Sequence, residues 1–72
     1  MINNATINQQ AKIQADIAKY APKQIRKLVK RVDLSKMYKF EASDLIDMIL
    51  SDLWEQVEFT LLNFEKKQHE LQ

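Results

Sequence analysis

The sequence contains no glycine, no cysteine and a single proline in 72 residues. Without cysteine the chain can form neither a disulfide nor a thiolate zinc site, and its one histidine, His69, cannot form a histidine pair around a metal. Without glycine it lacks the phosphate-binding loop, the dinucleotide fingerprint, the EF-hand loop and the nucleophile elbow, which all need glycine's backbone freedom. These absences exclude the common sequence signatures of nucleotide, metal and hydrolytic sites.

Long hydrophobic runs are also missing, since the longest is Met48-Ile49-Leu50. A signal peptide needs an apolar run of about 7 to 15 residues and a membrane-spanning helix about 20. We therefore expect a cytoplasmic protein with no membrane partner.

The short length limits the core that the chain can bury. We expect one small domain over residues 1–72, and a domain of this size buries only about 60% of the surface of its unfolded chain. No disulfide or metal is available to add stability, so we expect tight helix packing together with a homodimer or another protein partner.

The hydrophobic periodicity predicts an all-α fold, a helical bundle of three helices over about 6–20, 22–32 and 43–67. Thr6 and Gln9 fit a capping box at the start of the first helix. Pro22 ends that helix and suits the first turn of the next. Asp33 and Ser35, in the connector that follows, are typical turn residues.

Ser43 is the predicted N-cap of a long C-terminal helix. The apolar positions of this helix cover a wider arc than packing against one small neighbouring helix requires. Met48, Phe59 and Leu62 lie nearly opposite that arc. We expect part of this helix to form an interface with a second chain. The predicted interface residues are Trp54, Val57, Phe59, Leu61, Leu62 and Phe64.

The charges are sorted along the chain, although their sum is only +1. The segment 19–39 has eight basic residues and one acidic residue, whereas the segment 41–58 has six acidic residues and no basic one. The predicted second helix carries its basic residues opposite its apolar stripe: Lys23, Arg26, Lys27, Lys30 and Arg31.

Three interpretations of this basic face are open. It is a solvated face partly paired with the acidic segment, where exposed ion pairs contribute about 0 to 1 kcal/mol each. Alternatively, it binds phosphates of a nucleic acid, because five basic residues on one side of a helix can follow a phosphate backbone. The third interpretation is an acidic protein partner or the acidic face of a second copy.

Catalysis is not expected from the residues present. The three serines lack a well-placed base, since His69 lies beside the chain end, and the acidic pairs at i, i+3 spacing are typical of a solvated helix face. We expect no catalytic, metal or cofactor-binding residues. The resulting hypothesis is a non-enzymatic regulatory or adaptor protein that binds another macromolecule, by analogy of size and composition with small inhibitors and accessory factors of phages and mobile elements. The alternative is a small DNA- or RNA-binding protein that uses the basic helix 22–32.

Overall fold

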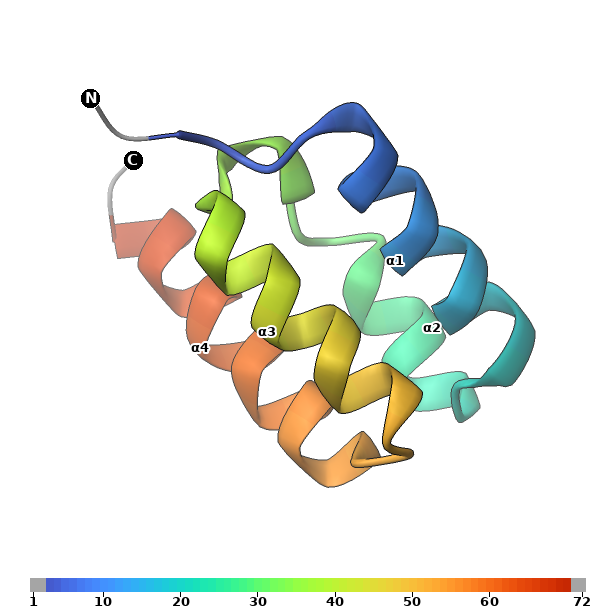
Figure 1. Cartoon of the computed structure of the whole chain (residues 1–72). Coiled ribbons are helices and arrows are strands. Elements are labelled where there is room, and N and C mark those ends of the chain that lie inside the picture. Colours follow the sequence, from blue (N-terminus) through green and yellow to red (C-terminus); the bar gives the residue numbers. More distant parts are fainter. Residues whose placement is uncertain (1–2, 71–72) are drawn as a thin grey trace.

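The computed structural model describes residues 3–70 and is all-helical in that range (Figure 1). It has four α-helices, not the three that the sequence predicts. In chain order they are α1 (Ile7–Tyr20), α2 (Lys23–Val29), α3 (Lys39–Leu50) and α4 (Trp54–Glu70), and a short 3₁₀-helix, η1 (Leu34–Lys36), follows α2.

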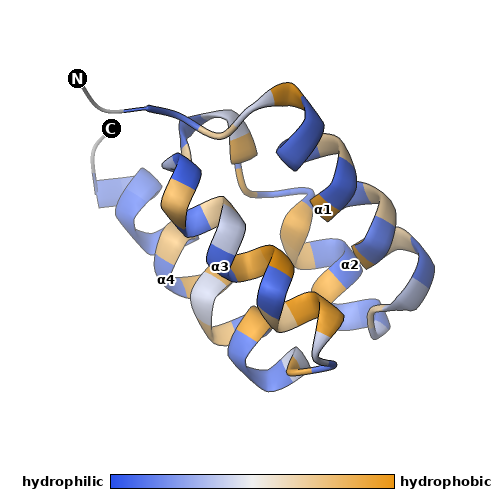
Figure 2. Cartoon of the chain, in the orientation of Figure 1, coloured by the Kyte–Doolittle hydropathy of each residue, from blue (hydrophilic) through white to orange (hydrophobic). Residues whose placement is uncertain are grey.

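The four helices form a closed ring around one core. Helix α1 packs against α2 and α3, and α4 packs against the same two helices, so α2 and α3 occupy opposite corners of the ring. Hydrophobic and hydrophilic residues alternate along each helix, as expected for helices that turn one face to a shared core (Figure 2).

The first helix begins and ends as predicted. The Gln9 backbone N–H donates to the Thr6 hydroxyl at 3.0 Å, and the Thr6 N–H donates to the Gln9 side-chain oxygen at 2.9 Å, which completes the capping box. Helix α1 ends at Tyr20, and Pro22 is the N-cap of α2. The predicted second helix is too long at its end. The N–H groups of Arg31 and Val32 bond three residues back, in tighter turns than an α-helix.

The predicted long helix over 43–67 is wrong because the chain reverses within it. Helix α3 stops at Leu50, and Asp52 adopts a left-handed conformation with φ of 58°. The Asp52 N–H donates to the Ile49 carbonyl and the Leu53 N–H donates to the Met48 carbonyl, which is the Schellman pattern of a helix C-terminus. Glycine usually takes the left-handed position, and aspartate takes it in this glycine-free chain.

Helix α3 also starts earlier than predicted, so Ser43 lies inside it and is not its N-cap. The N-cap is Tyr38, whose side chain makes no capping hydrogen bond, and its backbone N–H donates to the Glu41 carboxylate at 2.9 Å. The neighbouring N-terminal segment supports this start, since the Lys39 N–H donates to the Asn3 carbonyl and the Ala5 N–H to the Met37 carbonyl, both at 2.8 Å.

The core draws on every helix, and no polar or charged residue of the described range is buried in it. Leu45 is fully buried, although it lies outside the apolar face expected for one continuous helix. Helix α3 is separate from α4, so a different side of it faces the core. Between residues 3 and 70, no helix has the length and apolar character needed to cross a bilayer. The largest fully buried side chains are Ile13, Ile17, Met37, Leu45, Val57 and Leu61.

Two adjacent leucines test the helical phase of α4. Leu61 is fully buried and Leu62 is 45% exposed. Truncating Leu61 to alanine removes core contacts and leaves a cavity, so Leu61→Ala should lower the free energy of unfolding by about 2 to 5 kcal/mol. Leu62→Ala should lower it by less than about 1 kcal/mol. Urea denaturation at low protein concentration measures both, and equal losses would contradict the packing of α4.

The left-handed turn predicts that the order of stability of glycine and alanine variants is opposite at two sites. At Asp52, the glycine variant should be more stable than the alanine variant by about 1 kcal/mol, because a Cβ atom is unfavourable at positive φ. At Asp44, exposed within α3, the alanine variant should be more stable than the glycine variant by about 1 kcal/mol. Thermal unfolding of the four variants checks this, and the same rank at both sites would show that Asp52 is not left-handed.

Candidate binding surface on helices α1 and α2

The predicted basic residues of α2 and its C-terminal turn are all exposed. Arg31 differs from the others because its Nε atom lies 2.7 Å from the Glu65 carboxylate of α4. Lys23, Arg26, Lys27 and Lys30 have no acidic partner within 4 Å among residues 3–70. Four cations on this surface are therefore available to a ligand.

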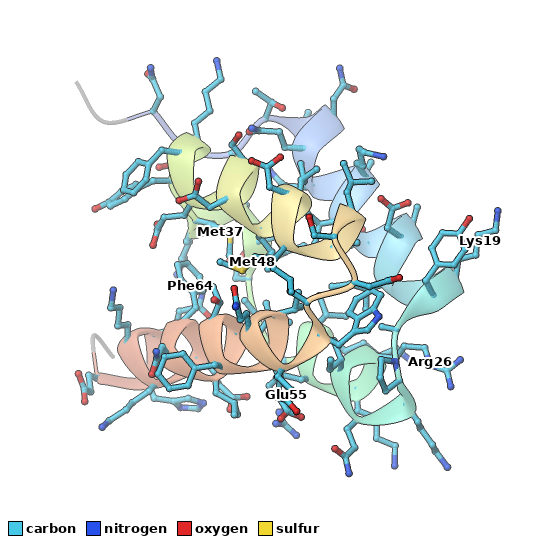
Figure 3. The ribbon with its side chains drawn as sticks, turned by 60° about the horizontal axis from the view of Figure 1, so that its bottom comes forward. Lys19, Arg26, Met37, Met48, Glu55 and Phe64 are labelled. Carbon is cyan, nitrogen blue, oxygen red and sulfur yellow. The ribbon has the colours of Figure 1, made fainter. Side chains whose placement is uncertain are left out.

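The acidic segment does not neutralise this basic surface. The only other ion pair in the described part of the chain joins Lys12 and Asp16 of α1 at 3.2 Å. Asp44 and Asp47 are exposed on α3, the corner of the ring opposite α2. Figure 3 shows Lys19 and Arg26 projecting from the same end of the molecule, away from Glu55 of α4. Intramolecular pairing with the acidic segment therefore does not account for the basic face.

A groove of about 320 Å³ runs between α1 and α2 beside these cations. Its accessible apolar part comes from Ala18 of α1 and Val29 of α2, with the fully buried Ile17 beneath them, and its polar part from Gln14, Arg26 and Lys30. No carboxylate of residues 3–70 lines it, since α2 has no acidic residue and Asp16 of α1 pairs with Lys12. The groove thus combines an apolar floor with a rim of two cations.

The outer surface of α1 next to the groove carries small side chains. Ala11, Ala15 and Ala18 are exposed and follow one another at helical spacing. Small side chains at such positions let another helix approach closely. Gln14 and the alanines were not among the predicted site residues, although the alanine spacing is readable from the sequence.

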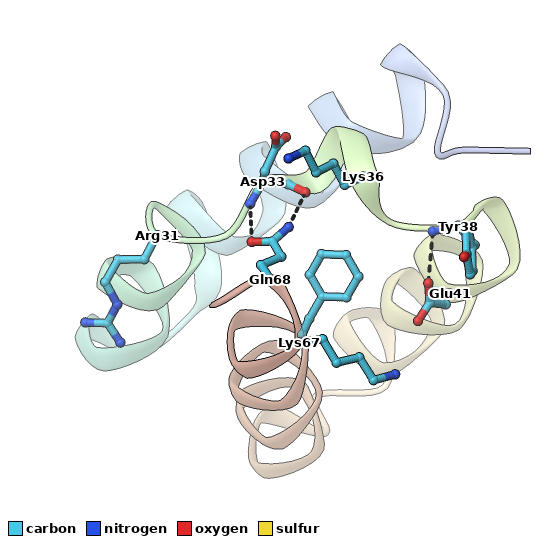
Figure 4. A pocket seen from close by; sticks show the side chains of 8 residues that line it. Arg31, Asp33, Lys36, Tyr38, Glu41, Lys67 and Gln68 are labelled. Atoms are coloured by element: carbon cyan, nitrogen blue, oxygen red, sulfur yellow. Dashed lines mark hydrogen bonds between the residues drawn. The ribbon is translucent and has the colours of Figure 1, made fainter. Parts of the chain in front are cut away.

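A second hollow, of about 420 Å³, lies where the segment after α2 meets the end of α4 (Figure 4). Most of the polar groups that line it form hydrogen bonds or an ion pair within the chain. Gln68 accepts from the Asp33 N–H at 3.2 Å and donates to the Asp33 carbonyl at 3.0 Å, while Glu41 accepts from Tyr38. Because these groups already bond within the chain, this hollow is a weaker candidate for a ligand than the α1–α2 groove.

The predicted interface residues of the C-terminal helix do not share one surface. Val57 and Leu61 are fully buried in the protein's own core, where no partner can reach them, and Trp54 and Phe64 are partly buried against that core. Phe59 and Leu62 are exposed on the outside of α4. Met48, predicted to lie with them, is instead half-buried between α3 and α4, where it accepts a bond from the Thr60 hydroxyl.

The serines and the histidine do not form a catalytic arrangement in the described range. The Ser35 hydroxyl donates to the Asp33 carboxylate, and His69 lies in the last turn of α4. Within residues 3–70, no three histidine or acidic side chains gather to hold a metal ion.

Comparison of the chain with protein-family models, with curated proteins and with solved structures found no match. The functional argument therefore uses the geometry of this chain.

The Ser35 hydroxyl bond lowers the pKa of Asp33 below its ordinary value of 3.8, and the Ser35 N–H and the Lys36 charge act in the same direction. The resulting stabilisation is present above the unfolded pKa and is lost as the pH falls through the folded one. Ser35→Ala should raise the Asp33 pKa toward its ordinary value, as measured by carboxyl-carbon NMR titration. Ser43→Ala is the control and should leave it unchanged.

Proposed function

We propose that this protein is a non-enzymatic regulatory or adaptor protein that binds an acidic segment of another protein in the groove between α1 and α2. The observation that carries the proposal is the accessible apolar floor of Ala18 and Val29 bounded by Arg26 and Lys30. A cytoplasmic location and self-association belong to the same proposal.

The groove fits an amphipathic helix with carboxylates along one edge. Its leucine-like side chains would lie on the apolar floor, and its carboxylates would face Arg26 and Lys30. The exposed alanines of α1 provide the close approach that helix packing needs. Lys23 and Lys27, beyond the rim, would attract the acidic segment from a distance and increase its association rate.

A nucleic-acid phosphate backbone is the second candidate ligand. Within residues 3–70 no acidic side chain pairs with Lys23, Arg26, Lys27 or Lys30, which favours it. A phosphate backbone needs cations but no apolar floor, and no exposed aromatic side chain lines the groove to stack on a base. The apolar floor is therefore better explained by a protein ligand.

Binding of two probes separates these functions. The first is a synthetic amphipathic helix with leucine on one face and glutamate along one edge of that face, and the second is a short DNA duplex. We expect the peptide to shift the amide NMR signals of α1 and α2. The double variant Arg26→Glu/Lys30→Glu should weaken peptide binding at least about tenfold, or about 1.4 kcal/mol.

The matched control is Lys39→Glu combined with Lys36→Glu, which changes the net charge equally but lies outside the groove. It should retain most of the peptide affinity. Equal losses in both double variants would show that net charge alone drives binding. Submicromolar duplex binding at physiological salt, with a log–log salt slope of about −0.9 per neutralised phosphate, would favour the nucleic-acid function instead.

A further inference from the structure

Four side chains form a strip on the face of α4 that points away from the core. Val57 and Leu61 mark the inward face. At 3.6 residues per turn, the opposite face carries Glu55, Phe59, Leu62 and Lys66 within an arc of about 60°, and the polar Asn63 and Glu70 lie beside this strip. All four are exposed. Neighbours within the chain leave this face open, because α2 contacts α4 on one flank through Arg31 and Glu65 and α3 on the other through Met48 and Thr60.

The centre of this face is apolar. Phe59 is 67% exposed and Leu62 is 45% exposed, one helical turn apart. Glu55 lies on the N-terminal side of this pair, and Lys66 lies on the C-terminal side. An exposed aromatic and leucine pair of this kind, with polar residues around it, is typical of a protein contact.

The order of these residues is symmetric about the midpoint between Thr60 and Leu61. Phe59 and Leu62 are equally far from that point, and so are Glu55 and Lys66. When two copies of such a helix pack antiparallel about a two-fold axis at this level, each residue lies at the same height as its counterpart in the other copy. Glu55 and Lys66 lie within about 20° of each other around the helix, so Glu55 comes opposite Lys66 of the second copy, while the Phe59 and Leu62 side chains of both copies meet around the axis.

We propose that the outward face of α4 is a self-association surface, on which a second copy of this chain packs antiparallel with Glu55 opposite Lys66. The charges select this arrangement. A parallel pair would place each Glu55 beside the other Glu55 and each Lys66 beside the other Lys66, which is unfavourable. The antiparallel register also places Glu58 opposite the uncharged Asn63 of the second copy, so no like charges oppose each other.

This inference rests on the self-association that belongs to the proposed function, but not on the ligand groove, because α4 contributes no residue to that groove. Two α4 helices can therefore pack together while α1 and α2 of each copy remain accessible. The contact is small, and interfaces below about 1,200 Å² give weak association. The dimer should accordingly form across the micromolar to millimolar range of protein concentration.

A charge-exchange experiment tests both the surface and its antiparallel register. Glu55→Lys alone places two lysines opposite each other at both ends of the dimer, and Lys66→Glu alone places two glutamates there. Each single variant should associate at least about tenfold more weakly than the unmodified protein in sedimentation equilibrium. An equimolar mixture of the two should recover the association, because each lysine then faces a glutamate of the other chain.

The double variant Glu55→Lys/Lys66→Glu should recover association by itself for the same reason. Circular dichroism and thermal melting of the dilute variants control for folding, since both residues are exposed. A second variant, Phe59→Ser/Leu62→Ser, should abolish association while the helical spectrum is retained. The inference is overturned if the unmodified protein stays monomeric up to millimolar concentration, or if neither the mixture nor the double variant recovers association.

Discussion

The arrangement of the four helices depends on the reversal at Asp52, where one residue in the left-handed region converts a continuous helical pattern into α3 and α4. This reversal lets α4 fold back beside α3 and reach α2, which closes the ring around the core. A non-glycine residue is disfavoured at that conformation by about 1 to 2 kcal/mol, although aspartate tolerates it better than most. The bonds from Asp52 and Leu53 back into α3, together with burial of Leu45, Val57 and Leu61, compensate for this strain.

Features determined by a few neighbouring residues were predictable from the sequence, and the helix break was not. The capping box of Thr6 and Gln9 and the helix end before Pro22 depend on local bonds and sterics, and both predictions are confirmed. Leu50, Trp54, Val57 and Leu61 continue one helical repeat across the reversal, so periodicity alone favours an unbroken helix. The break is decided by tertiary packing, which buries Leu45 and leaves Leu50 two-thirds exposed, at 66%.

Only the part of the candidate sites that depends on neighbouring residues in the sequence was predictable. The basic surface of α2 follows from a segment without acidic residues, and these cations are exposed as their helical phase requires. The groove beside them depends on how α1 and α2 cross, which no single segment encodes, so the sequence does not indicate that Gln14 and Ala18 line one surface with Arg26. The sequence predicts Val57 and Leu61 at an intermolecular contact, but the folded-back α4 buries them within the chain. Phe59 and Leu62 remain exposed, and their role in association stays a prediction.

The placement of α2 and α3 at opposite corners also affects how the molecule behaves before any contact forms. Because the net charge is only +1, the electrostatic field at a distance is dominated by the separation of the charges and not by their sum. Such a molecule experiences a torque near a charged partner. Near an anionic partner, this torque turns the α2 corner toward that partner as the two molecules diffuse. This orientation acts over roughly one Debye length, about 8 Å at physiological ionic strength. A nearly neutral protein thereby acquires a preferred direction of approach.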